Sequence, residues 1–160
     1  MTQFDFDDPP ASPLAWMEAW FAEGDALDVP NPNAMYLATV DADGTPSVRT
    51  VLRRGFDKRG VVFYTNYESR KSLAMIASGR ASVLFHWDQT DRQIRIEGRI
   101  SQVEPEVSDA YFAARHPESQ LGAWASQQSK SLSNRSQFEQ EVEAMPVSYT
   151  HLRAHETNQD

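Results

Sequence analysis

Residues 49–71 read RTVLRRGFDKRGVVFYTNYESRK, a stretch that is rich in Lys and Arg. The chain has 160 residues and a net charge of −8. Residues 49–80 hold eight Lys and Arg against two acids, a net charge of +6, while the other residues hold seven bases and twenty-one acids, a net charge of −14. A basic cluster in an acidic protein favours a small, highly charged anion as ligand.

The end of this stretch, Ser69-Arg70-Lys71, predicts a phosphate site. It precedes an apolar helical pattern over 69–78, so that two cations and unpaired backbone N–H groups meet at a helix N-terminus. A cation at this end opposes the helix dipole unless an anion is bound there. Arg49 on a predicted strand, with the hydroxyls of Tyr64 and Thr65, is expected to reach the same anion. The alternative is an ordinary solvated helix start.

Composition excludes several other classes of protein. The absence of cysteine rules out disulfides and thiolate metal sites and fits the reducing cytoplasm, which is the predicted location. The N-terminus lacks the apolar core of a secretory signal, and no apolar run approaches the ~18 residues of a membrane span. A net charge of −8 argues against nucleic-acid binding. His151 and His155 alone do not make a zinc site, so no metal is predicted.

The periodicity predicts a mainly β, antiparallel fold with peripheral helices, in which the sheet closes into a small barrel. We expect an acidic flexible arm over 1–12, one domain over 13–145 and an anomalous tail over 146–160, which continues neither a helical nor a strand pattern. The expected strands span 34–41, 47–56, 61–65, 81–87 and 92–103. The first expected helix has Ser12 as its N-cap and Pro13 as its first residue. Two more expected helices span 69–78 and 104–115, with Pro117 ending the last of these. A further helix begins at a Ser136/Glu139 capping box and carries Phe138, Val142 and Met145.

Two more groups of residues are candidates for ligand binding. Gln93 begins an alternating strand, and its amide offers a donor and an acceptor to the edge of a heterocycle. Tyr111 and Arg115, four apart on one predicted helix face, with Ser119 beyond the turn, suit a second phosphate. Taken singly, each of these residues also fits an ordinary surface position.

Five ordered blocks together resemble the pyridoxamine 5′-phosphate oxidase family, whose fold is an FMN-binding split β-barrel. The resemblance covers roughly 12–145. The blocks are Arg49-Thr-Val-Leu, Gly60-Val-Val-Phe-Tyr-Thr-Asn-Tyr-Glu-Ser-Arg-Lys71, Arg92-Gln-Ile-Arg-Ile-Glu-Gly98, Ser108-Asp-Ala-Tyr-Phe-Ala-Ala-Arg-His-Pro117 and Ser119-Gln-Leu-Gly-Ala-Trp-Ala-Ser-Gln-Gln-Ser129.

The resemblance implies a role for each matching residue. It implies that Gln128 and Ser129 reach FMN from the other subunit of a homodimer, and that Gln93 meets the flavin ring. The FMN-binding residues that it implies are Arg49, Thr50, Val51, Leu52, Arg53, Arg54, Tyr64, Thr65, Arg70, Lys71, Gln93, Gln128 and Ser129. The residues that it implies for substrate are Arg54, Tyr111, Arg115 and Ser119. It identifies no catalytic acid or base.

The implied reaction oxidises pyridoxine or pyridoxamine 5′-phosphate to pyridoxal 5′-phosphate, with hydride transfer to FMN and O2 as the final acceptor. The chain departs from the family in two respects. Arg54 replaces the usual lysine, and the family's C-terminal Trp-Gly-Gly and Arg-x-His-Asp-Arg segments are absent, so the tail over 146–160 matches nothing in the family. Two alternatives are another split-barrel flavoenzyme, such as a flavin reductase, and a non-catalytic binder of FMN or pyridoxal phosphate.

Overall fold

The computed structural model describes most of the chain up to Ala125 and isolated positions beyond it. The described residues are Asp5, 7–125, Gln128, Ser129, Ser131, 134–136, Glu139 and Gln140. They form two compact units, the first within 1–64 and 74–100, the second within 65–73 and 101–160. The expected tail over 146–160 lies outside the described residues, as do Phe138, Val142 and Met145 of the helix expected after Ser136.

The first unit begins with helix α1 (Leu14–Asp25), as the spacing of its apolar residues predicts. Pro13 is the N-cap residue, in helical conformation, and its carbonyl accepts the first helical hydrogen bond from Met17 N at 2.9 Å. The cap therefore lies one residue later than the expected cap at Ser12. Proline suits this position because its φ is already helical and the N–H it lacks would have no helical partner.

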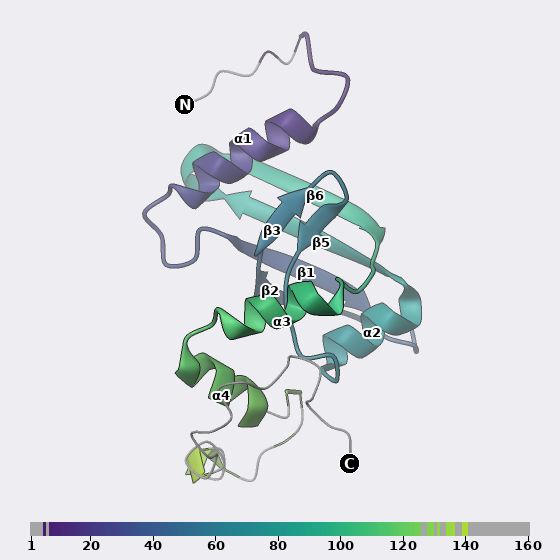
Figure 1. Ribbon diagram of the computed structural model, residues 1–160. Helices are drawn as coiled ribbons and strands as arrows, with labels where there is room; N and C mark the ends of the chain where they lie inside the picture. Colours follow the sequence, from purple (N-terminus) through teal and green to yellow (C-terminus); the bar gives the residue numbers. More distant parts are fainter. Residues whose placement is uncertain are drawn as a thin grey trace. The chain divides into compact units, whose positions relative to one another are not determined.

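Four antiparallel strands form the sheet of the first unit (Figure 1), in the order β2-β1-β5-β6. Gly44, with φ of +87°, lies in the tight turn between the first two strands. A separate two-stranded hairpin, β3-β4, follows them. The bounds are β1 (Ala34–Val40), β2 (Pro46–Leu52), β3 (Gly55–Asp57), β4 (Gly60–Val62), β5 (Arg80–Trp87) and β6 (Arg92–Arg99), with a short 3-10 helix, η1 (Asp88–Thr90), before β6.

Three expected strands were too long. The strand expected over 47–56 is broken at Arg53 and Arg54, because the Arg53 N–H donates to Asn33 O and the Arg54 N–H to Val62 O. This change of hydrogen-bonding partner moves the chain from one sheet to the next. The strand expected over 61–65 ends at Val62, and the strand expected over 92–103 ends at Arg99. The antiparallel arrangement is confirmed, although the strands of the described part do not close into a continuous barrel.

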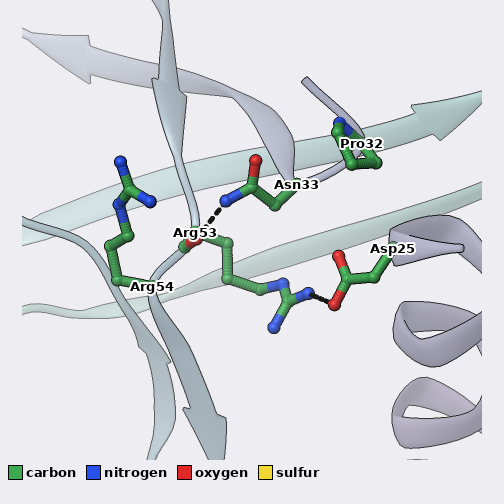
Figure 2. A pocket seen from close by; sticks show the side chains of 5 residues that line it. All are labelled: Asp25, Pro32, Asn33, Arg53 and Arg54. Atoms are coloured by element: carbon green, nitrogen blue, oxygen red, sulfur yellow. Dashed lines mark hydrogen bonds and ion pairs between the residues drawn. The ribbon is translucent and has the colours of Figure 1, made fainter. Parts of the chain in front are cut away.

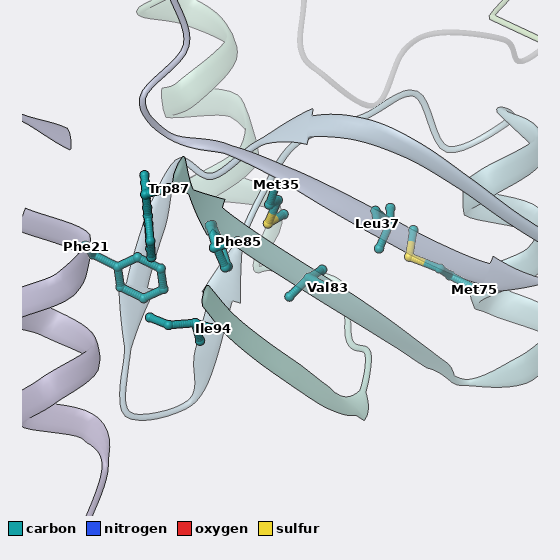
Figure 3. Packing of buried hydrophobic residues seen from close by; sticks show 8 residues of the cluster. All are labelled: Phe21, Met35, Leu37, Met75, Val83, Phe85, Trp87 and Ile94. Atoms are coloured by element: carbon teal, nitrogen blue, oxygen red, sulfur yellow. The ribbon is translucent and has the colours of Figure 1, made fainter. Parts of the chain in front are cut away.

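Alternation along the strands gives the four-stranded sheet an inner and an outer face. In β1, Met35 and Leu37 are fully buried, whereas Tyr36 between them is exposed. The inner face and α1 enclose a core of large apolar side chains (Figure 3). Its buried members are Phe21, Met35, Leu37, Met75, Val83, Phe85, Trp87 and Ile94. Phe21 lies edge-on to Phe85, with ring centroids 4.8 Å apart, so the helix contributes directly to the core.

Helix α2 (Arg70–Ser78) begins in the second unit and ends in the first. The second unit also contains α3 (Pro105–Ala113) and α4 (Pro117–Ala125). The first of these was expected to extend to Arg115 but ends two residues earlier. Pro117 disfavours helical conformation in the residue before it and is well placed as a first helical residue, so it begins α4. No helix among the described residues is long and apolar enough to cross a membrane.

Candidate functional site

The turn before α2 is built around Asn66. Its side-chain Oδ1 accepts a hydrogen bond from Glu68 N at 2.7 Å, and its carbonyl accepts bonds from the hydroxyls of Ser69 and Ser72 at 2.7 and 2.8 Å. Ser69 and Ser72 are buried, and their hydroxyls lie 3.1 Å apart. This buried hydroxyl network fixes the start of the helix and therefore the directions of Arg70 and Lys71.

Polar groups from two distant segments of the second unit meet at this helix start. Lys71 Nζ donates to Ser69 Oγ at 3.0 Å and to Gln128 Oε1 at 2.8 Å. The Arg70 backbone N–H donates to Ser129 Oγ at 3.2 Å, and the Thr65 hydroxyl lies 3.4 Å from Gln128 Oε1. The structure thus brings together five of the predicted site residues, which we call the phosphate seat: Thr65, Arg70, Lys71, Gln128 and Ser129.

The donors of the phosphate seat suit a phosphate group. A lysine ammonium, the N-terminal N–H of a helix and a hydroxyl are the donors that phosphate oxygens commonly accept from. Here the Lys71 ammonium and the Arg70 N–H donate to neutral side-chain oxygens of Gln128 and Ser129. Both acceptors belong to the same chain, whereas the family resemblance implied that these residues come from a second subunit.

Arg49 lies in β2, in the first unit, on the inner face of the sheet. Its guanidinium donates to Leu37 O at 3.0 Å and to the buried Thr39 hydroxyl at 2.8 Å, and it also bonds to Ser47. Val51, two residues further, faces the same side, and Leu52 ends the strand half-buried. The guanidinium of Arg49 is therefore held within the sheet by its own neighbours.

Thr50 and Gln93 lie on the outer face of the same sheet. Thr50 is exposed on the edge strand β2, and Gln93 is exposed on the opposite edge strand β6, where it pairs with His86. Two strands, β1 and β5, lie between them, and neighbouring strands are about 4.8 Å apart. The two residues thus share a face on which a flat group could lie across several strands. Tyr64, also in the first unit, is half-buried just after β4.

Arg53 and Arg54 line a pocket together with Asp25, Pro32 and Asn33 (Figure 2). The Arg53 guanidinium forms an ion pair with Asp25 at the end of α1, and only 12% of its side chain is exposed. Arg54 is exposed. The carboxylate of Asp25 was not among the predicted site residues, because no local motif connects two positions 28 residues apart.

The proposed substrate residues Tyr111, Arg115 and Ser119 lie on α3, on the following turn and on α4. Tyr111 and Arg115 are half-buried, and the Arg115 guanidinium lies 5.9 Å from the centre of the Phe112 ring. The buried Gln120 holds this corner, because its Nε2 donates to Arg115 O at 2.7 Å and to Ala113 O at 3.3 Å. Sequence reasoning missed Gln120, although its place just after a proline helix start was a usable signal.

No group of three or more His, Asp or Glu side chains in the described part of the chain is arranged to hold a metal ion.

Comparison with known proteins defines the class. A family model described as "Pyridoxamine 5′-phosphate oxidase" matches residues 24–147. The solved structure of PhzG from Burkholderia lata, in complex with tetrahydrophenazine-1-carboxylic acid, superposes with a TM-score of 0.82 at 32% identity, over 89% of this chain and 71% of that one. A pyridoxamine 5′-phosphate oxidase-related, FMN binding protein from Nostoc punctiforme has the same fold, with a TM-score of 0.64 at 21% identity, over 80% of this chain and 70% of that one. These matches confirm the split-barrel fold class.

Curated relatives specify the family further. The chain is 52% identical over 133 residues to the pyridoxine/pyridoxamine 5′-phosphate oxidase of Cupriavidus pinatubonensis, a match over 83% of this chain and 63% of the relative. It is 50% identical over 141 residues to the protein of the same name from Novosphingobium aromaticivorans, over 88% of this chain and 70% of the relative. The chain belongs to the pyridoxamine 5′-phosphate oxidase family, and it spans between three fifths and seven tenths of the length of these relatives.

Proposed function

We propose that this chain is the FMN-binding part of an oxidase that converts pyridoxine or pyridoxamine 5′-phosphate to pyridoxal 5′-phosphate, with O2 as acceptor. The observation that carries the proposal is the phosphate seat, where Lys71 Nζ and the Arg70 N–H converge with the Gln128 and Ser129 side chains. The matching relatives are named as pyridoxine/pyridoxamine 5′-phosphate oxidases, which supports this reaction over others of the family.

The residues of the phosphate seat fit the phosphate end of FMN. Lys71, Arg70 and Thr65 would hold it with charge-assisted and hydroxyl hydrogen bonds. Gln128 and Ser129, which now accept hydrogen bonds from Lys71 and the Arg70 N–H, would give up these bonds and bind the phosphate as well. FMN would supply the two-electron redox chemistry, so the protein needs to orient the reactants and exclude competing reactions. Gln93 and Thr50 on the outer face are proposed to contact the flavin, and Arg49 to support that strand from the inner face.

A second phosphate grip is assigned to Arg54, Tyr111, Arg115 and Ser119. Gln120 bonds to the backbone carbonyl of Arg115, so the turn that carries this arginine is held in place before ligand binds. A substrate phosphate bound at these residues would make the enzyme prefer phosphorylated substrates. A flavin reductase does not require such a preference.

We also propose a homodimer in the cytoplasm. Tyr36, Val40 and Val48 are 45%, 47% and 67% exposed on the outer face of the sheet, and an exposed apolar face of this kind supports association. The family resemblance implies in addition that Gln128 and Ser129 of one subunit reach the FMN of the other. The absence of cysteine supports a reducing compartment.

One observation favours a second candidate. The solved structure with a TM-score of 0.82 holds tetrahydrophenazine-1-carboxylic acid, a heterocycle with a carboxylate and no phosphate. An oxidase of a non-phosphorylated heterocycle is therefore the runner-up. Such a protein would bind pyridoxine 5′-phosphate and pyridoxine equally well.

The test compares Arg70→Ala with Arg115→Ala. Both variants replace one arginine of the second unit by alanine. FMN and riboflavin binding are titrated by flavin fluorescence, and pyridoxal 5′-phosphate is titrated by absorbance. We expect the unsubstituted chain to prefer FMN. Arg70→Ala leaves the backbone N–H of the phosphate seat in place but removes the guanidinium, and should weaken FMN binding about tenfold, the loss of one charge-assisted hydrogen bond. Arg115→Ala should leave FMN affinity unchanged and lower the affinity for pyridoxal 5′-phosphate. Equal affinity for both flavins, or the reverse pattern of losses, would contradict the proposal.

A further inference from the structure

Arg53 and Arg54 are consecutive and chemically identical, and Arg53 is held at both its backbone and its side chain. Asn33 binds both backbone groups of Arg53: its carbonyl accepts from the Arg53 N–H at 2.9 Å, and its Nδ2 donates to the Arg53 carbonyl at 2.8 Å. This doubly bonded residue lies where the chain leaves β2 and before β3 begins. Asn33 therefore sets the path of the chain at the crossing between the two sheets.

The Arg53 side chain is held as firmly as its backbone. Its guanidinium forms an ion pair with Asp25 and lies 4.6 Å from the centre of the Phe21 ring, so both partners come from α1. Its Nε is buried and has no hydrogen-bond partner among the residues that the structure describes. A buried arginine with an unsatisfied Nε contributes little to net stability, so the Arg53–Asp25 pair is better explained by the geometry that it specifies.

Arg54 points the other way. Its N–H donates to Val62 O at 2.8 Å, and its side chain is exposed. Figure 2 shows the two arginine side chains leaving the backbone in opposite directions, Arg53 toward Asp25 and Arg54 away from it. Successive side chains of an extended segment alternate in this way, so a slip of one residue would exchange the two arginines.

We infer that Asp25 is a positioning residue, which selects Arg53 as its partner and thereby directs Arg54 toward the phosphorylated ligand. The inference rests on the role proposed above for Arg54. The pair holds the Arg53 side chain on the side of α1, so Arg54, the next residue of the extended segment, leaves the backbone on the opposite side. Asp25 thus acts through Arg54 and does not itself contact the ligand.

A double-mutant cycle tests the inference in the FMN-loaded chain, with Asp25→Asn, Arg54→Ala and the double variant. Affinity for pyridoxal 5′-phosphate is measured by absorbance titration. We expect Asp25→Asn to weaken binding about tenfold in the presence of Arg54. In the Arg54→Ala background the same change should have almost no effect, since there is no Arg54 left to misdirect. Equal losses in both backgrounds would overturn the inference.

A second measurement does not need flavin or substrate. Phenylglyoxal modifies accessible arginines, and peptide mass spectrometry reports each position. In the unsubstituted chain Arg54 should react and Arg53 should be protected; Asp25→Asn should raise Arg53 labelling severalfold. Asp57→Asn, which removes the exposed carboxylate paired with Arg59, is the matched control and should leave Arg53 labelling unchanged. Equal Arg53 labelling with and without Asp25 would overturn the inference, whereas failure of the unsubstituted chain to bind FMN would contradict only the proposed function.

Discussion

Arg53 and Arg59 are both paired with an aspartate, but their surroundings give the two pairs different roles. The Arg53 side chain is 12% exposed beside Asp25, while the Arg59 side chain is 83% exposed beside Asp57. Water and salt screen the exposed pair, so it adds little to the free energy of unfolding. In the Arg53–Asp25 pair the arginine is buried while 44% of the Asp25 side chain is exposed, and this pair instead specifies a geometry. At the scale of single residues, burial therefore decides what an ion pair does.

The exposed pair between Arg59 and Asp57 predicts how the ionisation of Asp57 depends on pH. Hydrogen bonds from the Arg59 side chain, with a further one from its backbone N–H, lower the pKa of the Asp57 carboxyl below its ordinary value. Because this pKa is depressed in the folded state, the stabilising contribution is present above the ordinary carboxyl pKa, about 3.9, and is lost as the pH falls through the lower folded value. NMR titration should show Asp57 ionising below the ordinary aspartate pKa. Arg59→Gln should return its pKa to the ordinary value; an unchanged midpoint would show that Arg59 is not the cause.

At the scale of elements, α1 is attached to the sheet by two acids at its C-terminal end. Asp25 pairs with Arg53, and Glu23 pairs with Arg92, whose guanidinium also lies 5.0 Å from the centre of the Trp20 ring. Acids near a helix C-terminus oppose the helix dipole. The two arginines offset this, so the last turn of α1 depends on tertiary partners.

Close packing between α1 and the sheet gives a prediction for Gly24. A Cβ at this position would lie 2.3 Å from Nε1 of Trp87, which itself donates to Pro32 O at 3.2 Å. Gly24→Ala should therefore lower the free energy of unfolding by about 1–3 kcal/mol, as overpacking does. Urea denaturation followed by tryptophan fluorescence would measure it. Gly122→Ala in α4, where a Cβ would have nothing within 4 Å, is the control and should be neutral or stabilising by about 0.5–1 kcal/mol. Equal effects at both positions would argue against the tight contact.

At the scale of the whole molecule, the outer face of the sheet is the surface proposed to form the homodimer. In a symmetric interface a substitution occurs in both subunits. An introduced charge therefore lies near the same charge of the other subunit and is repelled by it, or it is buried without an opposite charge. Val48→Glu should weaken dimerisation roughly tenfold or more, measured by light scattering over a dilution series. Val107→Glu, at a valine of α3 that is 49% exposed, should leave it unchanged. A chain that is monomeric at all concentrations before substitution would contradict the dimer.

Much of the fold was predictable because it depends on neighbouring residues. Helix starts at Pro13 and before Arg70, the turn at Gly44 and the alternation along β1 all follow from local conformational preferences and periodicity. The break between β2 and β3 was not predictable, because the residues there read as a continuous strand. Their backbone groups bond to Asn33, twenty residues earlier, and to Val62.

By itself the sequence determined the family, the antiparallel fold and the basic helix start with Arg70 and Lys71. Each of these follows from a run of contiguous residues or from ordered sequence blocks. The tertiary structure alone decided that Arg53 turns to Asp25, 28 residues away, and that Lys71 meets Gln128, 57 residues away. It also decided that Arg49 faces into the sheet. The physical reason is that burial and pairing depend on which distant groups share a low-dielectric space, and the spacing of residues along the chain does not encode this.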